Sequence, residues 1–132
     1  MLASSLSFVL QEFRRLMSGI SAVWNHASRT SAELSLSGML DALTPYGPDD
    51  RAAWCEGEVA LGRTLMRLVP EDRFDRQPVW TRDRSACLVA DVRLDNRDEL
   101  MTDLGLGAGL ADSEVLLAAW ERWGVGLSLI HI

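Results

Sequence analysis

The sequence has few residues of the kinds that build metal or thiol chemistry. Its only cysteines are Cys55 and Cys87, and its only histidines are His26 and His131. The cysteines form no CxxC or other metal-ligand spacing, and each histidine stands alone in the sequence. Neither a zinc site nor a histidine-based catalytic pair is therefore predicted. We expect a reduced, cytoplasmic protein with two free thiols.

Clustered positive charge and long apolar runs are also lacking. The net charge is −6, and arginine, which supplies the positive charge, is spread along the chain. Nucleic acid and anionic membranes need a basic face, so neither is predicted as a partner. No apolar run approaches the ~18 residues of a membrane span. With 48% hydrophobic and 24% charged residues among 132, the chain is predicted to be globular, one domain or part of one.

Two stretches have apolar residues at the i, i+3, i+4, i+7 spacing of an amphipathic helix. One lies within residues 1–16, where it indicates either a docking or membrane-surface helix or sequence upstream of the true start. The other covers residues 31–43, with a stripe formed by Leu36, Met39, Leu40 and Leu43. Two prolines and a glycine in residues 44–50 should end this second helix.

Extended segments are predicted before and after that helix. Residues 17–25 are typical of a short buried strand, in which Gly19 lets a neighbour approach closely. Further extended segments are predicted at residues 52–56, 59–68, 77–81 and 86–94. The apolar run at residues 86–90 suits a central strand covered on both faces.

Two more helices are predicted near the end of the chain. Asn96 should open the first, with Glu99 at a capping-box-like spacing, and glycines from Gly105 onward should close it. Asp112 should cap the second, whose apolar stripe contains Leu116, Ala119, Trp120 and Trp123.

Several of these motifs resemble the amino-terminal domain of class II glutamine amidotransferases, as found in asparagine synthetases. Residues 17–25 resemble the first strand, Gly47-Pro48-Asp49 the core of a His-Arg-Gly-Pro-Asp turn, and residues 112–117 an Asp-x-Glu-Val-Leu segment. Leu61-Gly62 and Gln77-Pro78 match two shorter motifs. The resemblance implies an α+β fold, an N-terminal-nucleophile-type four-layer αββα sandwich. Residues 93–100 look most like the lasso-peptide macrolactam synthetase branch, which needs no ammonia from glutamine.

The resemblance also assigns pocket roles, and most of them fall on unsuitable residues. Ser18 stands where the family has its catalytic Cys, and a Ser hydroxyl is the weaker nucleophile. Leu65 stands at the Arg that binds the glutamine carboxylate, and an apolar side chain cannot form that pair. Asp91 stands at the oxyanion Asn, where a carboxylate would repel the developing charge. Asp112, the ligand for the substrate amino group, is retained.

An N-terminal nucleophile uses its own α-amine as base, so it must be the first residue of the mature chain. We therefore expect Met17 to be the true start, residues 1–16 to be an upstream extension, and residues 17–126 to be a partial amidotransferase-like domain. Residues 127–132 match the translation of a common sequencing adapter, so we expect an artefact there and a domain truncated at its C-terminus. An ordinary apolar C-terminal strand is the alternative.

The leading hypothesis is the glutaminase-inactive amino-terminal domain of an asparagine-synthetase-like amidoligase. A missing downstream synthetase domain would then use ATP and magnesium to adenylate a peptide or small carboxylate. This chain contains no Ser-Gly-Gly-x-Asp-Ser pyrophosphate loop, so no cofactor is expected here. The alternatives are an active Ser-type N-terminal-nucleophile amidase and a non-catalytic interaction module.

Overall fold

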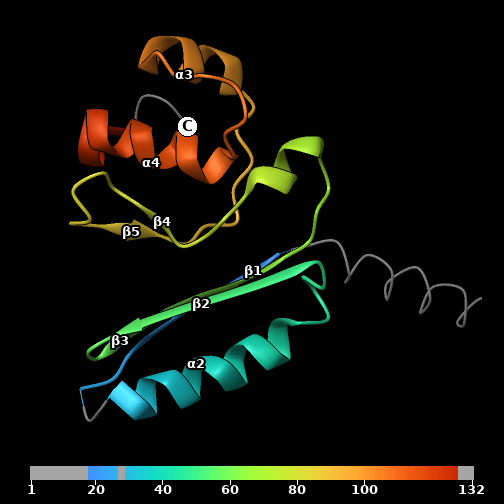
Figure 1. Ribbon diagram of the computed structural model, residues 1–132, viewed down its shortest axis with the longest axis vertical. Coiled ribbons are helices and arrows are strands. Elements are labelled where there is room, and N and C mark those ends of the chain that lie inside the picture. The colour runs from blue at the N-terminus through green and yellow to red at the C-terminus, as the bar shows by residue number, and fades with distance from the viewer. Residues whose placement is uncertain (1–17, 27–28, 128–132) are drawn as a thin grey trace, which may run out of the picture. The chain divides into compact units, whose positions relative to one another are not determined.

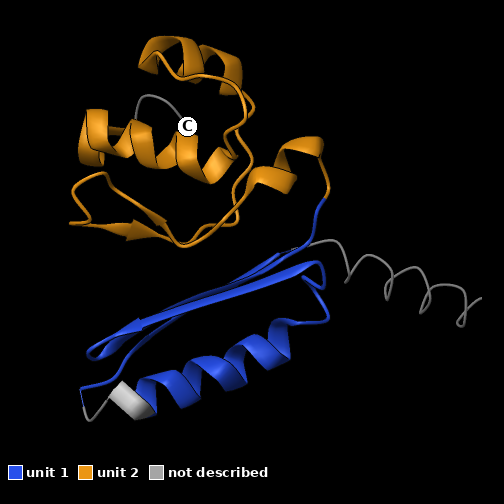
Figure 2. Cartoon of the chain, in the orientation of Figure 1, with its two compact units in different colours: residues 1–67 blue, residues 68–132 orange. Residues whose placement is uncertain are grey.

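The computed structural model describes residues 18–26 and 29–127, which belong to two compact units (Figures 1 and 2). The first unit ends at Arg67 and the second begins at Leu68. Both units combine helices with strands, so the predicted α+β class is confirmed. The helix predicted within residues 1–16 lies outside the described residues, as do residues 128–132 of the expected adapter tail.

Unit 1 is a three-stranded antiparallel sheet with a helix on one face (Figure 1). Its elements, in chain order, are β1 (Gly19–Trp24), α2 (Arg29–Leu43), β2 (Asp50–Glu56) and β3 (Val59–Leu65). The strand order is β1-β3-β2, which makes β3 the central strand, and α2 contacts all three strands. The predicted helix and extended segments are therefore confirmed in this unit.

The core of unit 1 lies between α2 and β3. Ala32, Leu36 and Leu40 are at most 2% exposed and pack on Ala60. A Cβ on Gly62 would lie 2.8 Å from Leu40 Cδ1, so the absence of a side chain there lets the helix approach the sheet.

Met39 was predicted on the buried stripe of α2, and this is wrong because its side chain is 42% exposed. The buried stripe runs at i, i+4 and i+8 through Ala32, Leu36 and Leu40, and Met39 lies beside it. Small alanine carries little hydrophobic signal, so the sequence pattern favoured the larger methionine.

The prediction that residues 17–25 form a buried strand is half wrong. β1 pairs with β3 alone among the described strands, and its side chains alternate in exposure. Ser21 is 5% exposed and Val23 packs against the core under α2, whereas Ile20 is 51% and Trp24 72% exposed. The strand is apolar on both faces, but only alternate residues face the helix.

Unit 2 contains short strands and several helical segments (Figure 1). In chain order they are η1 (Pro70–Phe74), β4 (Val79–Trp80), β5 (Cys87–Leu88), α3 (Arg97–Leu104), α4 (Asp112–Trp123) and η2 (Gly124–Gly126). β4 and β5 form an antiparallel pair, and α4 contacts both α3 and β4. Leu94, Leu100 and Val115 form the core of this unit.

The central strand predicted at residues 86–90 is wrong. Only Cys87 and Leu88 pair with a neighbour, and both are half-buried. Beyond Leu88, the backbone of Ala90 bonds to the side chain of Gln77, which takes the place of a neighbouring strand.

The two helices of unit 2 lie where the sequence predicts them, but their starts differ in detail. Asn96 is the N-cap of α3 without a side-chain capping bond, so the predicted capping box with Glu99 is wrong. The N-cap of α4 is Ala111 rather than Asp112, and its N–H donates to Glu114 Oε2 at 2.8 Å. Gly105 ends α3, as predicted, and it adopts the left-handed conformation.

The buried stripe of α4 also differs from the prediction. Trp120 is 45% exposed, whereas Val115 and Ala119 are fully buried and Ser113 is 2% exposed. Six apolar residues in a row, from Val115 to Trp120, made the helix face ambiguous in sequence. In the part of the chain that the structure describes, no helix is long and apolar enough to cross a bilayer.

Candidate functional site

Ser18 directly precedes β1 and lies next to the end of β3. Because Gly19 pairs with Thr64 in the antiparallel register, Ser18 comes opposite Leu65 at the next step. The Met66 N–H donates to Ser18 Oγ at 3.1 Å. The hydroxyl oxygen therefore already accepts a backbone hydrogen bond, which draws electron density away from the atom that would attack.

Leu65 ends β3, is 5% exposed, and pairs across the sheet with Asp50. Its side chain offers no hydrogen-bond donor, so this position cannot hold a carboxylate. Arg63 lies two residues earlier and therefore on the same face of the strand. The guanidinium of Arg63 is 1% exposed, and its Nη2 lies 3.3 Å from Asp50 Oδ2. The positive charge nearest Leu65 along β3 is thus paired with a carboxylate of this chain.

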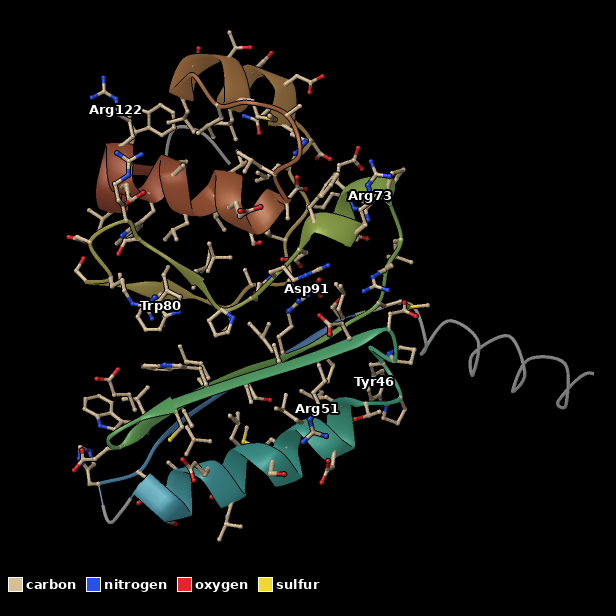
Figure 3. All side chains as sticks on the ribbon, in the orientation of Figure 1. Tyr46, Arg51, Arg73, Trp80, Asp91 and Arg122 are labelled. Carbon is tan, nitrogen blue, oxygen red and sulfur yellow. The ribbon has the colours of Figure 1, made fainter. Side chains whose placement is uncertain are left out.

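Asp91 belongs to unit 2 and lies in the segment between β5 and α3, where Figure 3 labels it. Its side chain is exposed. Asp112, the first residue of α4, is in contrast only 17% exposed. The carboxylate of Asp91 is thus open to solvent, whereas that of Asp112 is mostly buried.

Both carboxylate oxygens of Asp112 have partners within unit 2. Leu94 N–H donates to Oδ2 at 2.8 Å, and Arg97 Nη1 forms an ion pair with Oδ1. Arg97 Nη2 in turn donates to the carbonyl of Leu110 at 2.6 Å. The carboxylate of Asp112 is therefore already paired with the guanidinium of Arg97. A substrate ammonium group would have to compete with that guanidinium.

A buried polar network, which the sequence analysis did not identify, lies close to this ion pair. Gln77 Nε2 lies 3.1 Å from both carboxylate oxygens of Asp75, and Ser113 Oγ donates to Asp75 Oδ1 at 2.8 Å. All three side chains are at most 8% exposed. The Gln77-Pro78 motif marked the position, but no local pattern links it to Ser113.

Asp83, in the turn between β4 and β5, has a strongly shifted pKa. Hydrogen bonds from the Ser85 N–H and hydroxyl, and from the Thr81 hydroxyl, lower the pKa of Asp83 to about 2. Arg84 stacks over the ring of Trp80, labelled in Figure 3, at 4.6 Å from its centroid. These contacts order an exposed turn, and nothing about them requires a ligand.

The structure brings Ser18 and Leu65 together in unit 1, whereas Asp91 and Asp112 belong to unit 2. The pocket roles assigned by resemblance remain predictions. Among residues 18–26 and 29–127, no cluster of three or more His, Cys, Asp or Glu side chains could hold a metal ion.

Comparison with protein families matches residues 17–129 to the glutamine amidotransferase domain. This match covers well over half of the chain and includes all four positions discussed above. The chain therefore belongs to the glutamine amidotransferase domain family, as the motifs predicted. A comparison with curated proteins and one with solved structures each gave no match.

Proposed function

We propose that this chain is the amino-terminal glutamine amidotransferase-like domain of an asparagine-synthetase-like amidoligase, and that it does not hydrolyse glutamine. One observation carries the second part of the proposal. Ser18, at the nucleophile position, accepts a hydrogen bond from Met66 N–H and lies beside the buried, apolar Leu65.

Ser18 and Leu65 are both unfavourable residues for hydrolysis of the glutamine amide. A nucleophile is activated when a base removes its proton and leaves its lone pairs free to attack. Hydrogen bonds to a charged group contribute about 1.5–3 kcal/mol, and Leu65 supplies none to a glutamine carboxylate. Asp112 could still attract an ammonium group, but Arg97 already neutralises it. Binding and attack are therefore both weakened.

The proposal extends to the complete fold. An αββα sandwich contains two layers of sheet, each covered by helices. Unit 1 supplies a sheet with α2 on one face, and unit 2 supplies the β4–β5 pair in contact with α4. Each unit by itself thus places a helix against strands, as the layers of such a sandwich require.

The finer assignment, to an amidoligase of the lasso-peptide macrolactam synthetase kind, is supported by the resemblance of residues 93–100. In such an enzyme a downstream domain would bind ATP and magnesium and activate a peptide or small carboxylate. We place this activity in the cytoplasm, in keeping with the two free thiols. Sequencing the gene beyond the codon for Gly126 tests the assignment. An ATP-binding loop would support it, and a stop codon would favour a non-catalytic interaction module.

Glutamine hydrolysis is tested on protein that starts at Met17, so that Met removal leaves Ser18 with a free α-amine. Glutamate release from glutamine is compared with that of a Ser18→Ala variant, which is the matched control. We expect equal background rates. Release that disappears in the control would overturn the proposal in favour of an active Ser-type amidase.

A further inference from the structure

Residues 90–94, termed the strap, lie between β5 and α3 and belong to neither. The strand ladder ends at Leu88, and in the described part of the chain no backbone group of the strap bonds to another backbone group. At the first end of the strap, Ala90 N–H donates to Gln77 Oε1 at 2.6 Å, and Gln77 Nε2 donates to the Ala90 carbonyl at 2.9 Å. One side chain therefore makes both bonds that a neighbouring strand would make.

The orientation of the Gln77 amide is fixed by its other neighbour. The carboxylate of Asp75 can only accept, so it holds Nε2 on its side and leaves Oε1 directed at the Ala90 N–H. Ser113 Oγ, on α4, donates to the same carboxylate. The first end of the strap is thus fastened to α4 through three buried side chains.

The second end of the strap is fastened to α4 as well. Leu94 N–H donates to Asp112 Oδ2, and Asp112 is held in place by Arg97. Leu94 is part of the core of unit 2 and Val92 packs against that core, while Asp91 and Arg93 are exposed.

We propose that the strap is a local conformational unit, closed by Gln77 at one end and Asp112 at the other, which opens as a whole. A segment held by a few side-chain bonds and two apolar side chains, without a strand ladder, is less stable than the helices that it contacts. Because both ends are anchored to α4, we expect them to open together. Its opening changes how the Asp91 carboxylate and the Arg93 guanidinium are presented at the surface. The inference does not depend on the proposed function.

Hydrogen exchange at single amides, followed by NMR on the full chain, tests the proposal. Gln77→Met keeps the size of the side chain but removes both bonds to Ala90. We expect exchange at the Ala90 amide to accelerate by about tenfold or more, with a parallel increase at Leu94. Thr102→Val is the matched control, because it removes a side-chain bond to Asp98 within α3 and should change neither amide.

An unchanged Leu94 amide in Gln77→Met would show that the two ends open independently, and would overturn the proposal. If that variant does not fold, hydrogen exchange in the unmodified protein at low guanidinium concentrations decides whether the two ends open together. The proposal requires Ala90 and Leu94 to share one opening reaction, distinct from that of Val115 in α4. Exchange of all three amides through one common unfolding would contradict it.

Discussion

Replacing Gly47 by alanine should destabilise the protein through a clash between backbone segments. A Cβ at Gly47 would lie 2.5 Å from the carbonyl carbon of Thr64 and 2.7 Å from the nitrogen of Leu65. Neither atom can rotate away as a side chain could. The turn is also anchored to β3, since Asp49 N–H donates to the Leu65 carbonyl at 2.9 Å. Either the turn or the end of β3 must therefore move.

Overpacking of this kind costs about 1–3 kcal/mol, and loss of the anchoring bond adds to it, so we expect about 3 kcal/mol. Gly38 provides the matched control, because it lies inside α2 and nothing is within 4 Å of its added Cβ. Gly38→Ala should stabilise the helix by about 0.5–1 kcal/mol. The two glycine-to-alanine changes should thus differ by about 3–4 kcal/mol, against a total stability of about 5–15 kcal/mol.

Urea unfolding followed by circular dichroism measures both variants. With a slope of about 2 kcal/mol per molar, the midpoint of Gly47→Ala should fall by about 1–2 M and that of Gly38→Ala should rise slightly. A midpoint for Gly47→Ala at or above that of the unmodified protein would refute the argument that a side chain at residue 47 clashes with the backbone of β3.

Three further changes have definite expected outcomes. Leu40→Ala removes a fully buried side chain and should lower the unfolding free energy in urea by about 2–5 kcal/mol. Because the folded pKa of Asp83 is about 2, below its ordinary 3.8, its bonds stabilise the fold above about pH 4 and stop doing so as the pH falls toward 2. This part of the pH dependence of the unfolding midpoint should be absent in Asp83→Asn. Arg97→Met leaves the mostly buried Asp112 carboxylate without its guanidinium and should cost about 1–3 kcal/mol in urea, whereas exposed Arg122→Met should change stability by about 0.5 kcal/mol or less.

The helices could be predicted from sequence because their signals are local. Apolar spacing and a stop at Pro45 predicted a helix over residues 31–43, and α2 spans Arg29–Leu43. The glycine that ends α3 was equally visible. Which face is buried was harder, since Ala32 is part of the core of unit 1 and Met39 is not.

The wrong prediction of a central strand in unit 2 has a physical cause that lies outside the local sequence. The run at residues 86–90 is apolar enough for a central strand, but a strand also needs a neighbour. Gln77 takes that place for Ala90, across 13 residues of sequence. No periodicity encodes the substitution of a side chain for a strand.

The candidate site could be predicted only in part. The resemblance identified Ser18 and Leu65 as unsuitable for glutamine hydrolysis, and the register of β1 on β3 places them side by side. The hydrogen bond from Met66 to Ser18 spans 48 residues, and the Arg97–Asp112 pair spans 15. Such contacts depend on the tertiary fold, so residue types alone could not reveal them.

The most direct test of the account is whether any change at Ser18 alone produces glutamine hydrolysis. In protein with Ser18→Cys at a free N-terminus, the nucleophile matches the one the family uses, but Leu65 still cannot bind the glutamine carboxylate. The account predicts glutamate release no faster than that of Ser18→Ala, in both the unmodified and the Ser18→Cys protein. Glutamate release by either protein at a rate clearly above that of Ser18→Ala would contradict it.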